Sequence, residues 1–212
     1  MQNTDLIDRI INEVDTGLRA IFTPKNRSSN RPSPATMRDT TLTIDEKRHV
    51  IGLLRVNHAG EVCAQALYQG QALTARHTNI KEKLCAAAAE EIDHLAWCET
   101  RLNELDGKPS RLNLFWYTGS LMIGALAGLA GDSISLGFVA ETERQVTLHL
   151  TRHLSHLPIN DLKTKAILTQ MQADEEAHAT MAINAGGIDL PQWLKYIMTG
   201  VSKLLTKSSY YF

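Results

Sequence analysis

The 212-residue sequence lacks the features that mark several common classes of protein. No stretch alternates apolar and polar residues with period two for long enough to be a convincing β-strand, so we expect an all-α chain. The three cysteines form no Cys-x-x-Cys pair, which favours free thiols in a reducing compartment. A net charge of −1 provides no basic excess, so we expect no nucleic-acid partner. The first 20 residues carry four acids and no apolar centre, unlike a secretory signal.

Proline and helical periodicity divide the chain into two parts. Residues 4–22 repeat apolar side chains at helical spacing and predict a short amphipathic helix. Residues 23–41 hold three prolines among serines, asparagines and arginines, which predicts a mobile linker. We therefore expect an N-terminal helix and linker at 1–42 and one helical domain at 43–212.

Six helices are predicted in the domain. Thr43 and Glu46 fit a capping box at the start of the first helix, which runs to about residue 76. The second should end at Gly107, acting as its C-cap, with Pro109 blocking continuation. The expected ranges are about 43–76, 79–105, 112–131, 132–157, 160–185 and from Pro191 onward.

The domain also contains two copies of Glu-x-x-His. One lone glutamate lies 30 residues before the glutamate of the first copy, and another lies 32 residues before that of the second. All of these residues lie in the middle of otherwise apolar helical stripes, where a carboxylate without a partner would be costly, so a cation is expected there. The candidate ligands are Glu61, Glu91, His94, Glu143, Glu175 and His178.

Four carboxylates and two imidazoles on four helices are the ligand set of a ferritin-like di-iron site. Such ligands suit iron or manganese. The predicted fold is an all-α, ferritin-like four-helix bundle with two additional apolar or amphipathic helices. Glu141 competes with Glu143, but the apolar stripe selects Glu143. We expect His149 to act behind the ligands, Tyr68 and His58 to be weaker candidates for the cavity wall, and Glu90, Glu99 and Glu176 to be solvated.

Residues 112–131 contain no charged side chain. That length allows a membrane span, but a span would place the two halves of the metal site on opposite sides of the membrane. A buried helix, or one at a membrane surface or substrate channel, is favoured. The C-terminal segment combines Trp193 and Tyr196 with Lys195, Lys203 and Lys207, which fits a helix in the lipid headgroup region as well as an ordinary packing helix.

Several of these runs resemble one family. Leu54-Arg-Val-Asn-His-Ala-Gly-Glu61, Glu91-Ile-Asp-His94, Phe138-Val-Ala-Glu-Thr-Glu143 and Asp174-Glu-Glu-Ala-His178 are similar to the motifs of the demethoxyubiquinone hydroxylases. The likeness covers about residues 44–188. Cys63 stands where a small residue such as Ala is expected, and Leu150 where some relatives have Tyr; neither belongs to the ligand set.

This resemblance implies a di-iron monooxygenase of ubiquinone biosynthesis. It implies two iron ions per chain at the same six residues, with His149 near the substrate. The implied substrate is a polyprenylated 6-methoxy-3-methyl-1,4-benzoquinol, hydroxylated with O2. The implied location is peripheral, at the membrane surface on the cytoplasmic face of a bacterial inner membrane, with a biosynthetic complex or a homo-oligomer left open.

Three other functions compete with this interpretation, and one of them, a non-enzymatic bundle at a membrane surface, would leave the six buried candidate ligands unexplained. A ferritin-like or rubrerythrin-like protein that handles iron or peroxide needs no lipid-facing surface, and the Cys-rich module usual in rubrerythrins is absent. A di-iron hydroxylase acting on modified tRNA is disfavoured because the sequence has no basic stripe.

Overall fold

A computed structural model of the chain describes residues 6–22 and 27–212, and within these ranges it contains seven α-helices and no β-strand. The all-α prediction is confirmed. The helices are α1 (Leu6–Ile21), α2 (Ile44–Thr74), α3 (Thr78–Glu104), α4 (Asn113–Ala130), α5 (Asp132–His156), α6 (Leu162–Asn184) and α7 (Gln192–Tyr211).

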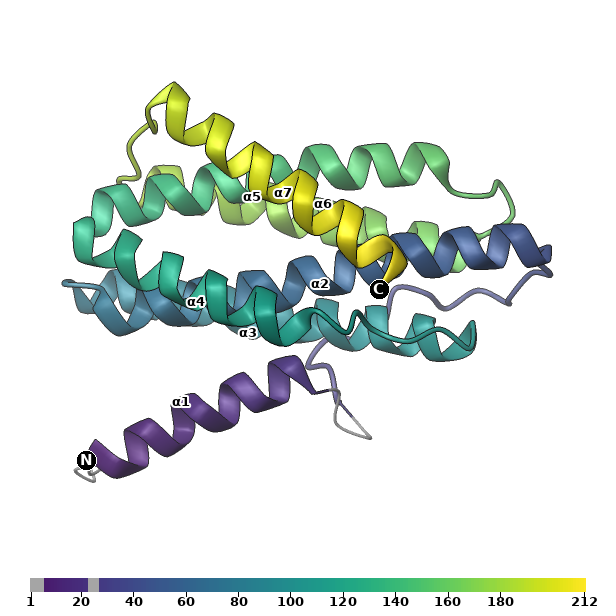
Figure 1. The fold of residues 1–212 in the computed structure, drawn as a ribbon, viewed down its shortest axis with the longest axis horizontal. Coiled ribbons are helices and arrows are strands. Elements are labelled where there is room, and N and C mark those ends of the chain that lie inside the picture. The colour runs from purple at the N-terminus through teal and green to yellow at the C-terminus, as the bar shows by residue number, and fades with distance from the viewer. Residues whose placement is uncertain (1–5, 23–26) are drawn as a thin grey trace.

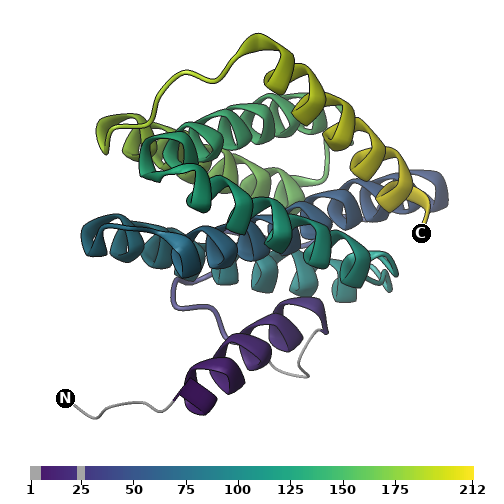
Figure 2. The same ribbon diagram turned by 60° about the vertical axis from the view of Figure 1, so that its left-hand side comes forward.

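Four long helices form the bundle. Helix α2 packs against α3, α5 packs against α6, and α3 also meets α6, so the two pairs enclose one interior. Helix α4 joins the pairs and lies along α2, while α7 crosses α2 and α5 on the outside (Figure 1). Helix α1 is set off from the bundle over much of its length (Figure 2), and its main contacts are with α2 and α4. The predicted bundle with additional helices is confirmed.

Local signals set the ends of the helices. The Thr43 hydroxyl accepts a hydrogen bond from the Glu46 backbone N–H at 3.3 Å. The Glu46 carboxylate accepts one from the Thr43 backbone N–H at 2.8 Å, as the capping box predicts. The predicted C-cap of α3 is wrong, because the helix is capped at Leu105, two residues before Gly107. Asp106, with φ 55°, adopts the left-handed conformation, and the Gly107 N–H then bonds the Leu102 carbonyl at 2.7 Å. An aspartate tolerates this conformation well enough to end the helix.

Helix α4 has two unlike faces. Gly124 lies so close to the backbone of Leu67 on α2 that a side chain there would clash, and Gly70 approaches Leu121 in the same way. The opposite face of α4 leaves Phe115 and Leu126 largely exposed. Gly124 and Gly128 of α4 therefore form part of its close contact with α2. Within residues 6–22 and 27–212, no helix has both the length and the apolar character to cross a membrane.

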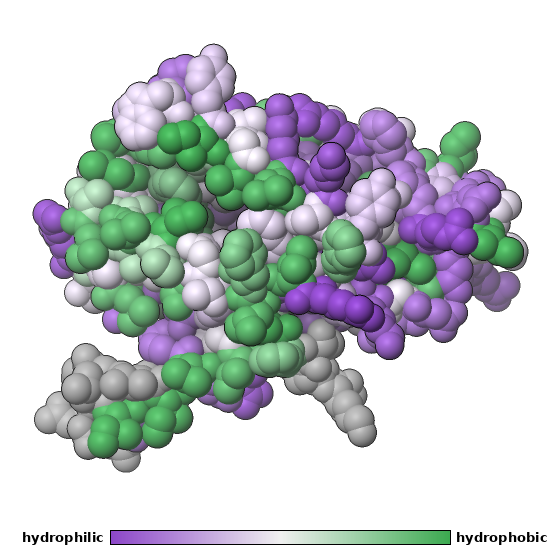
Figure 3. Space-filling view, in the orientation of Figure 1, coloured by the Kyte–Doolittle hydropathy of each residue, from purple (hydrophilic) through white to green (hydrophobic). Residues whose placement is uncertain are grey.

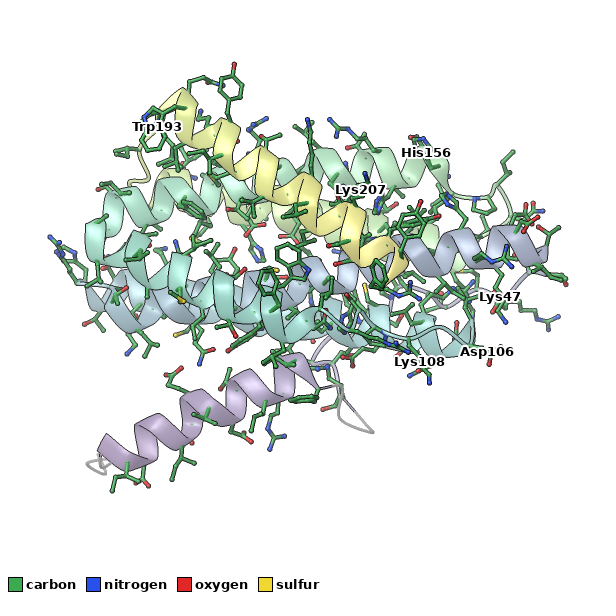
Figure 4. The ribbon with its side chains drawn as sticks, viewed as in Figure 1. Lys47, Asp106, Lys108, His156, Trp193 and Lys207 are labelled. Carbon is green, nitrogen blue, oxygen red and sulfur yellow. The ribbon has the colours of Figure 1, made fainter. Side chains whose placement is uncertain are left out.

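Exposed apolar side chains gather on one part of the surface. Figure 3 shows them over α4 and the first half of α7, and again along α1, while the other end of the bundle is mostly hydrophilic. Trp193 marks the start of α7 and Lys207 lies toward its other end (Figure 4). The exposed residues on these helices include Ile11 and Leu18, Met122 and Leu126, and Trp193, Tyr196 and Leu204.

The segment between α1 and α2 is tied to the bundle. We call residues 27–42 the strap. Near its end, Asp39 accepts a bond from Arg101 at 2.8 Å, and the Thr40 hydroxyl donates to the Asn160 carbonyl at 2.5 Å. These contacts do not test the expected mobility or the division at residue 42, which stay predictions. Residues 4–5 of the expected first helix and 23–26 of the expected linker lie outside the described ranges.

Candidate metal centre

The six candidate ligands come from four helices and meet in the middle of the bundle. Helix α2 contributes one residue, α3 two, α5 one and α6 two. Their potential ligand atoms fall into two groups, each within 4.8 Å. The His94 position comprises Glu61, Glu91, His94 and Glu175; the His178 position comprises Glu91, Glu143, Glu175 and His178. All six residues are buried.

Two carboxylates are shared between these positions. Glu91 and Glu175 belong to both groups, whereas Glu61 and Glu143 belong to one each. The ligand sets therefore cross the sequence repeat, because the His94 position takes Glu175 from the second half. Glu91 and Glu175 are therefore the two carboxylates available to both positions.

Both imidazoles turn the same nitrogen toward the carboxylates. The Nδ1 atom of His94 lies 2.9 Å from Glu91 and 3.3 Å from Glu175. The Nδ1 atom of His178 lies 3.3 Å from Glu91 and 3.2 Å from Glu175. An imidazole that offers the Nδ1 lone pair to a metal keeps its proton on Nε2, which then needs an acceptor.

The electrostatics of the cluster show a shortage of positive charge. Burial, and then the charge of Glu91, raise the pKa of Glu61 well above its usual value. Burial and then Glu175 do the same to the pKa of Glu143. Burial acts to lower the pKa of His178, but the contacts with Glu175 and Glu91 outweigh it and raise this pKa to about 11. Carboxylates this close retain protons unless cations neutralise them.

The donor set fits a pair of metal ions. Glu91 Oε1 is buried with no hydrogen-bond partner, and the Nδ1 atom of His178 lies 3.3 Å from it. Oxygen and imidazole nitrogen donors without thiolate suit iron or manganese. Tyr68 adds a hydroxyl that donates to Glu143 at 2.5 Å. The residues therefore fit two divalent ions, with Tyr68 orienting one terminal carboxylate.

The four glutamates near the candidate ligands differ in their exposure to solvent. Glu141 points away from the cluster and pairs with Arg144 at 2.7 Å, while Glu176 is exposed and Glu90 is half-exposed. The expectation that Glu99 is solvated is wrong. Glu99 is buried between Arg27 of the strap at 2.8 Å and His58 at 3.1 Å. Its partner Arg27 is 72 residues away in sequence, so helical periodicity had no means of indicating this pair.

Sequence reasoning missed a second layer of residues around His94. The outward Nε2 atom of His94 lies 2.9 Å from Asp174. Asp174 also accepts bonds from Arg31 at 2.9 Å and from Gln170 at 3.0 Å. The only signal in the sequence is that Asp174 is an additional acid directly before Glu175. Its partner, His94, is 80 residues away on another helix, so the pairing cannot be read from the spacing.

A largely apolar cavity of about 310 Å³ adjoins the His94 position. Residues from α2, α4, α5 and α7 line it, among them Glu61 and His149. Asn57, one helical turn before Glu61, also lines it, and both polar atoms of its amide are buried without a partner. The Nε2 atom of His149 has no partner either. Tyr68 and His58, the weaker candidates for the cavity wall, are both absent from its lining.

A second, more open cleft lies at the end of the bundle near the C-terminus. Its volume is about 960 Å³, and Lys47, Asp106 and Lys108 are among its lining residues (Figure 4). None of the six candidate ligands lines it. The smaller cavity is the one that reaches the candidate metal centre.

Comparison with known proteins gives a consistent result. Residues 48–209 match the family described as "Ubiquinone biosynthesis protein COQ7". The chain is 63% identical over 212 residues to a 3-demethoxyubiquinol 3-hydroxylase of Legionella pneumophila (strain Corby), covering 100% of both chains. It is 56% identical over 205 residues to the 3-demethoxyubiquinol 3-hydroxylase of Acinetobacter baylyi, covering 97% of both chains.

Proposed function

This chain belongs to the COQ7 family of ubiquinone biosynthesis proteins, and we propose that it is a hydroxylase of 3-demethoxyubiquinol that uses O2 and two iron ions. The observation that carries the proposal is the meeting of the apolar cavity with the six-residue cluster at Glu61. A storage or peroxide-handling protein requires no such cavity. The ferritin-like alternative is therefore disfavoured.

The proposed iron ligands are the six clustered residues. Glu91 and Glu175 would serve both positions, while Glu61 with His94, and Glu143 with His178, would complete one position each. Bound iron would supply the activation of O2, and two electrons from an external reductant with two protons would convert one oxygen atom to water while the other enters a ring C–H bond. The protein's own part is to hold the carboxylates, orient Glu143 through Tyr68 and keep bulk water from the buried cluster.

The cavity suits the head group of a quinol. Its wall is mostly apolar, with few polar groups, as in small-molecule sites generally. The unpartnered Asn57 amide offers one donor and one acceptor, which match a ring hydroxyl or methoxy oxygen. Burial, and then the charge of Arg152, lower the pKa of His149 to about 4, so its ring is neutral at pH 7. We propose that Asn57 and His149 orient the ring beside Glu61.

The prenyl tail would leave through the outer surface. Ile123 of α4 and Ile197 and Val201 of α7 line the cavity and are also 39–54% exposed, so the cavity wall is continuous with the apolar surface. We propose that this surface lies on a membrane, on the cytoplasmic face, which lets the tail stay in lipid during catalysis. A complex with other biosynthetic enzymes or a homo-oligomer stays a proposal.

The test is turnover with isotopically labelled O2. Purified, iron-loaded protein given a reductant and a short-chain 3-demethoxyubiquinol should form a product that carries one labelled oxygen atom, detected by mass spectrometry. Glu176→Ala, an exposed neighbour of a ligand, is the matched control and should behave as wild type. Iron uptake far beyond two ions per chain without hydroxylation would instead support the ferritin-like alternative.

Membrane association has a separate test. Met122→Ser with Leu126→Ser removes exposed apolar area from α4 without touching the face that packs on α2. In flotation with phospholipid vesicles, the wild type should rise with the lipid and the double variant should stay in the bottom fraction. The matched control is Thr180→Ser, on the exposed side of α6. Equal flotation of all three proteins would contradict the proposed membrane surface.

A further inference from the structure

The strap brings two arginines onto buried acids of the bundle. Arg27 meets Glu99 at 2.8 Å, and its side chain is only 7% exposed. Arg31 reaches Asp93 through Nε at 2.9 Å and Asp174 through Nη2 at 2.9 Å. The strap lies before residue 48, where the match to the family begins. The strap, which lies outside the bundle, thus supplies the positively charged partners of Glu99, Asp93 and Asp174.

Arg31 is the better placed of the two to act on the metal centre. The same oxygen of Asp174, Oδ2, accepts from Arg31 Nη2 and from His94 Nε2, each at 2.9 Å. Arg31 Nη2 and His94 Nε2 themselves lie 3.5 Å apart. An arginine only donates, and an imidazole that binds metal through Nδ1 also donates through Nε2, so the carboxylate between them is what joins the two groups.

The position of Arg31 is fixed on three sides. Its guanidinium lies over the Trp97 ring, 5.0 Å from the centroid. Asp93 accepts its Nε–H and, through its other oxygen, the backbone N–H of Asn30 at 2.6 Å. Asp93 is 2% exposed, and both of its bonds come from the strap. A planar guanidinium held this way can bridge two carboxylates at fixed angles, which an ammonium cannot.

We propose that Arg31 is a positioning residue for the metal centre. It fixes Asp174, Asp174 holds the Nε2–H of His94, and the Nδ1 lone pair is thereby aimed at the His94 position. This inference rests on the proposed metal-binding function. Residues behind a metal-binding histidine typically change metal affinity by about 10- to 100-fold when removed.

The experiment is a metal titration of purified protein with Fe(II) under anaerobic conditions, followed by Mössbauer spectroscopy. Arg31→Gln should weaken binding at one position by about 10- to 100-fold and change one of two iron signals, leaving the other unchanged. Arg31→Lys should recover part of the loss, because it restores charge but cannot bridge both acids. Arg38→Gln removes the same charge from an exposed site of the strap and should match wild type.

The outcomes separate this inference from the proposed function. A wild-type chain that fails to bind two ions would refute the metal centre itself. Two wild-type affinities that persist in Arg31→Gln would overturn only the role of Arg31. An equal loss at both positions, together with a lower melting temperature of the metal-free variant, would show a merely structural role and also overturn it.

Discussion

The His94 and His178 positions are built from the same motif but have different surroundings. His94 is fully buried and its Nε2 lies 2.9 Å from Asp174, which is 12% exposed. His178 Nε2 has no hydrogen-bond partner, and the nearest acid, Glu90, lies 3.5 Å away with 46% exposure. The internal repeat therefore places equivalent candidate ligands in both halves of the cluster, but the hydrogen-bond partners of these ligands differ between the halves.

The two outer acids nevertheless occupy equivalent places in the repeat. Glu90 directly precedes Glu91, and Asp174 directly precedes Glu175. Each faces the histidine of the other half, so the helices α3 and α6 support one another reciprocally. The longer Glu90 side chain ends in solvent, whereas Asp174 is held by Arg31 and Gln170.

The strap accounts for this difference. Arg31 supports one half-site only, and Asp93, which anchors Arg31, has the uncharged Ala177 at its equivalent place in the second half. The cavity adds to the asymmetry, because it touches Glu61 but not Glu143. The His94 position is thus the one whose histidine is held by more contacts, and it lies next to the proposed substrate cavity.

The largest expected effect comes from removing a residue that both positions share. Glu175→Ala should abolish turnover and reduce bound iron from two ions toward none, because both ligand groups lose an oxygen. Glu61→Ala should abolish turnover but keep most of the iron at the His178 position. Iron analysis with the turnover assay would measure both, with Glu176→Ala as control. Equal iron loss in the two variants would contradict the shared role of Glu175.

The distinction between shared and terminal ligands marks how far sequence reasoning reaches. Caps such as Thr43 with Glu46 are local, so helix ends were predicted to within a few residues, and helical spacing selected Glu61 and Glu143, which the structure brings into the buried cluster. The bond between Arg31 and Asp174 joins residues 143 apart in a pattern with no period. Such contacts depend on how the elements pack, which periodicity does not encode.

The asymmetry between the two outer acids can be tested directly. Asp174→Ala should weaken metal binding at the His94 position by about 10- to 100-fold, because the imidazole loses its acceptor. Glu90→Ala should change binding at the His178 position by less than about 3-fold, since a half-exposed carboxylate at 3.5 Å holds the ring weakly. Fe(II) titrations of both variants measure the effects. Equal losses would show that the half-sites are equivalent in spite of the strap.

A smaller effect is expected on the cavity side of the His94 position. Asn57→Leu replaces an unpartnered buried amide by an apolar side chain of similar volume, so it should stabilise the quinol-free protein by about 1–3 kcal/mol. It should also raise KM for the quinol by about 10-fold with little change in metal content, because one hydrogen bond to the ring is lost.

Asn113→Leu is the matched control for Asn57. Asn113 is also buried, but it does not line the cavity and its amide reaches His58 at 3.4 Å. Chemical denaturation and steady-state kinetics of both variants give the comparison. Asn113→Leu should leave KM unchanged and give no gain in stability. A destabilised Asn57→Leu with wild-type KM would identify Asn57 as an ordinary core residue.

A last comparison contrasts imidazoles that face acids with imidazoles whose pKa is lowered by burial. Contacts with acids raise the pKa of His178, whereas burial lowers the pKa of His149 to about 4 and of His153 to about 2. The rings of His149 and His153 have centroids 3.8 Å apart. Positive charge adds to this lowering, because Arg152 acts on the pKa of His149, and His149, His49 and His156 act on the pKa of His153.

This pair should make the protein less stable in mild acid. Because both folded-state pKa values lie below the unfolded value of about 6.5, the unfolded chain binds more protons, and stability is lost as pH falls from about 6.5 toward 4. Wild type should lose about 1 kcal/mol per histidine more than His149→Gln/His153→Gln between pH 7.5 and 5.5, measured by chemical denaturation of metal-free protein. The acid cluster titrates in both proteins and cancels in the difference. Parallel losses would mean that the two rings are protonated in the folded state, and the contrast with His178 would then rest on geometry alone.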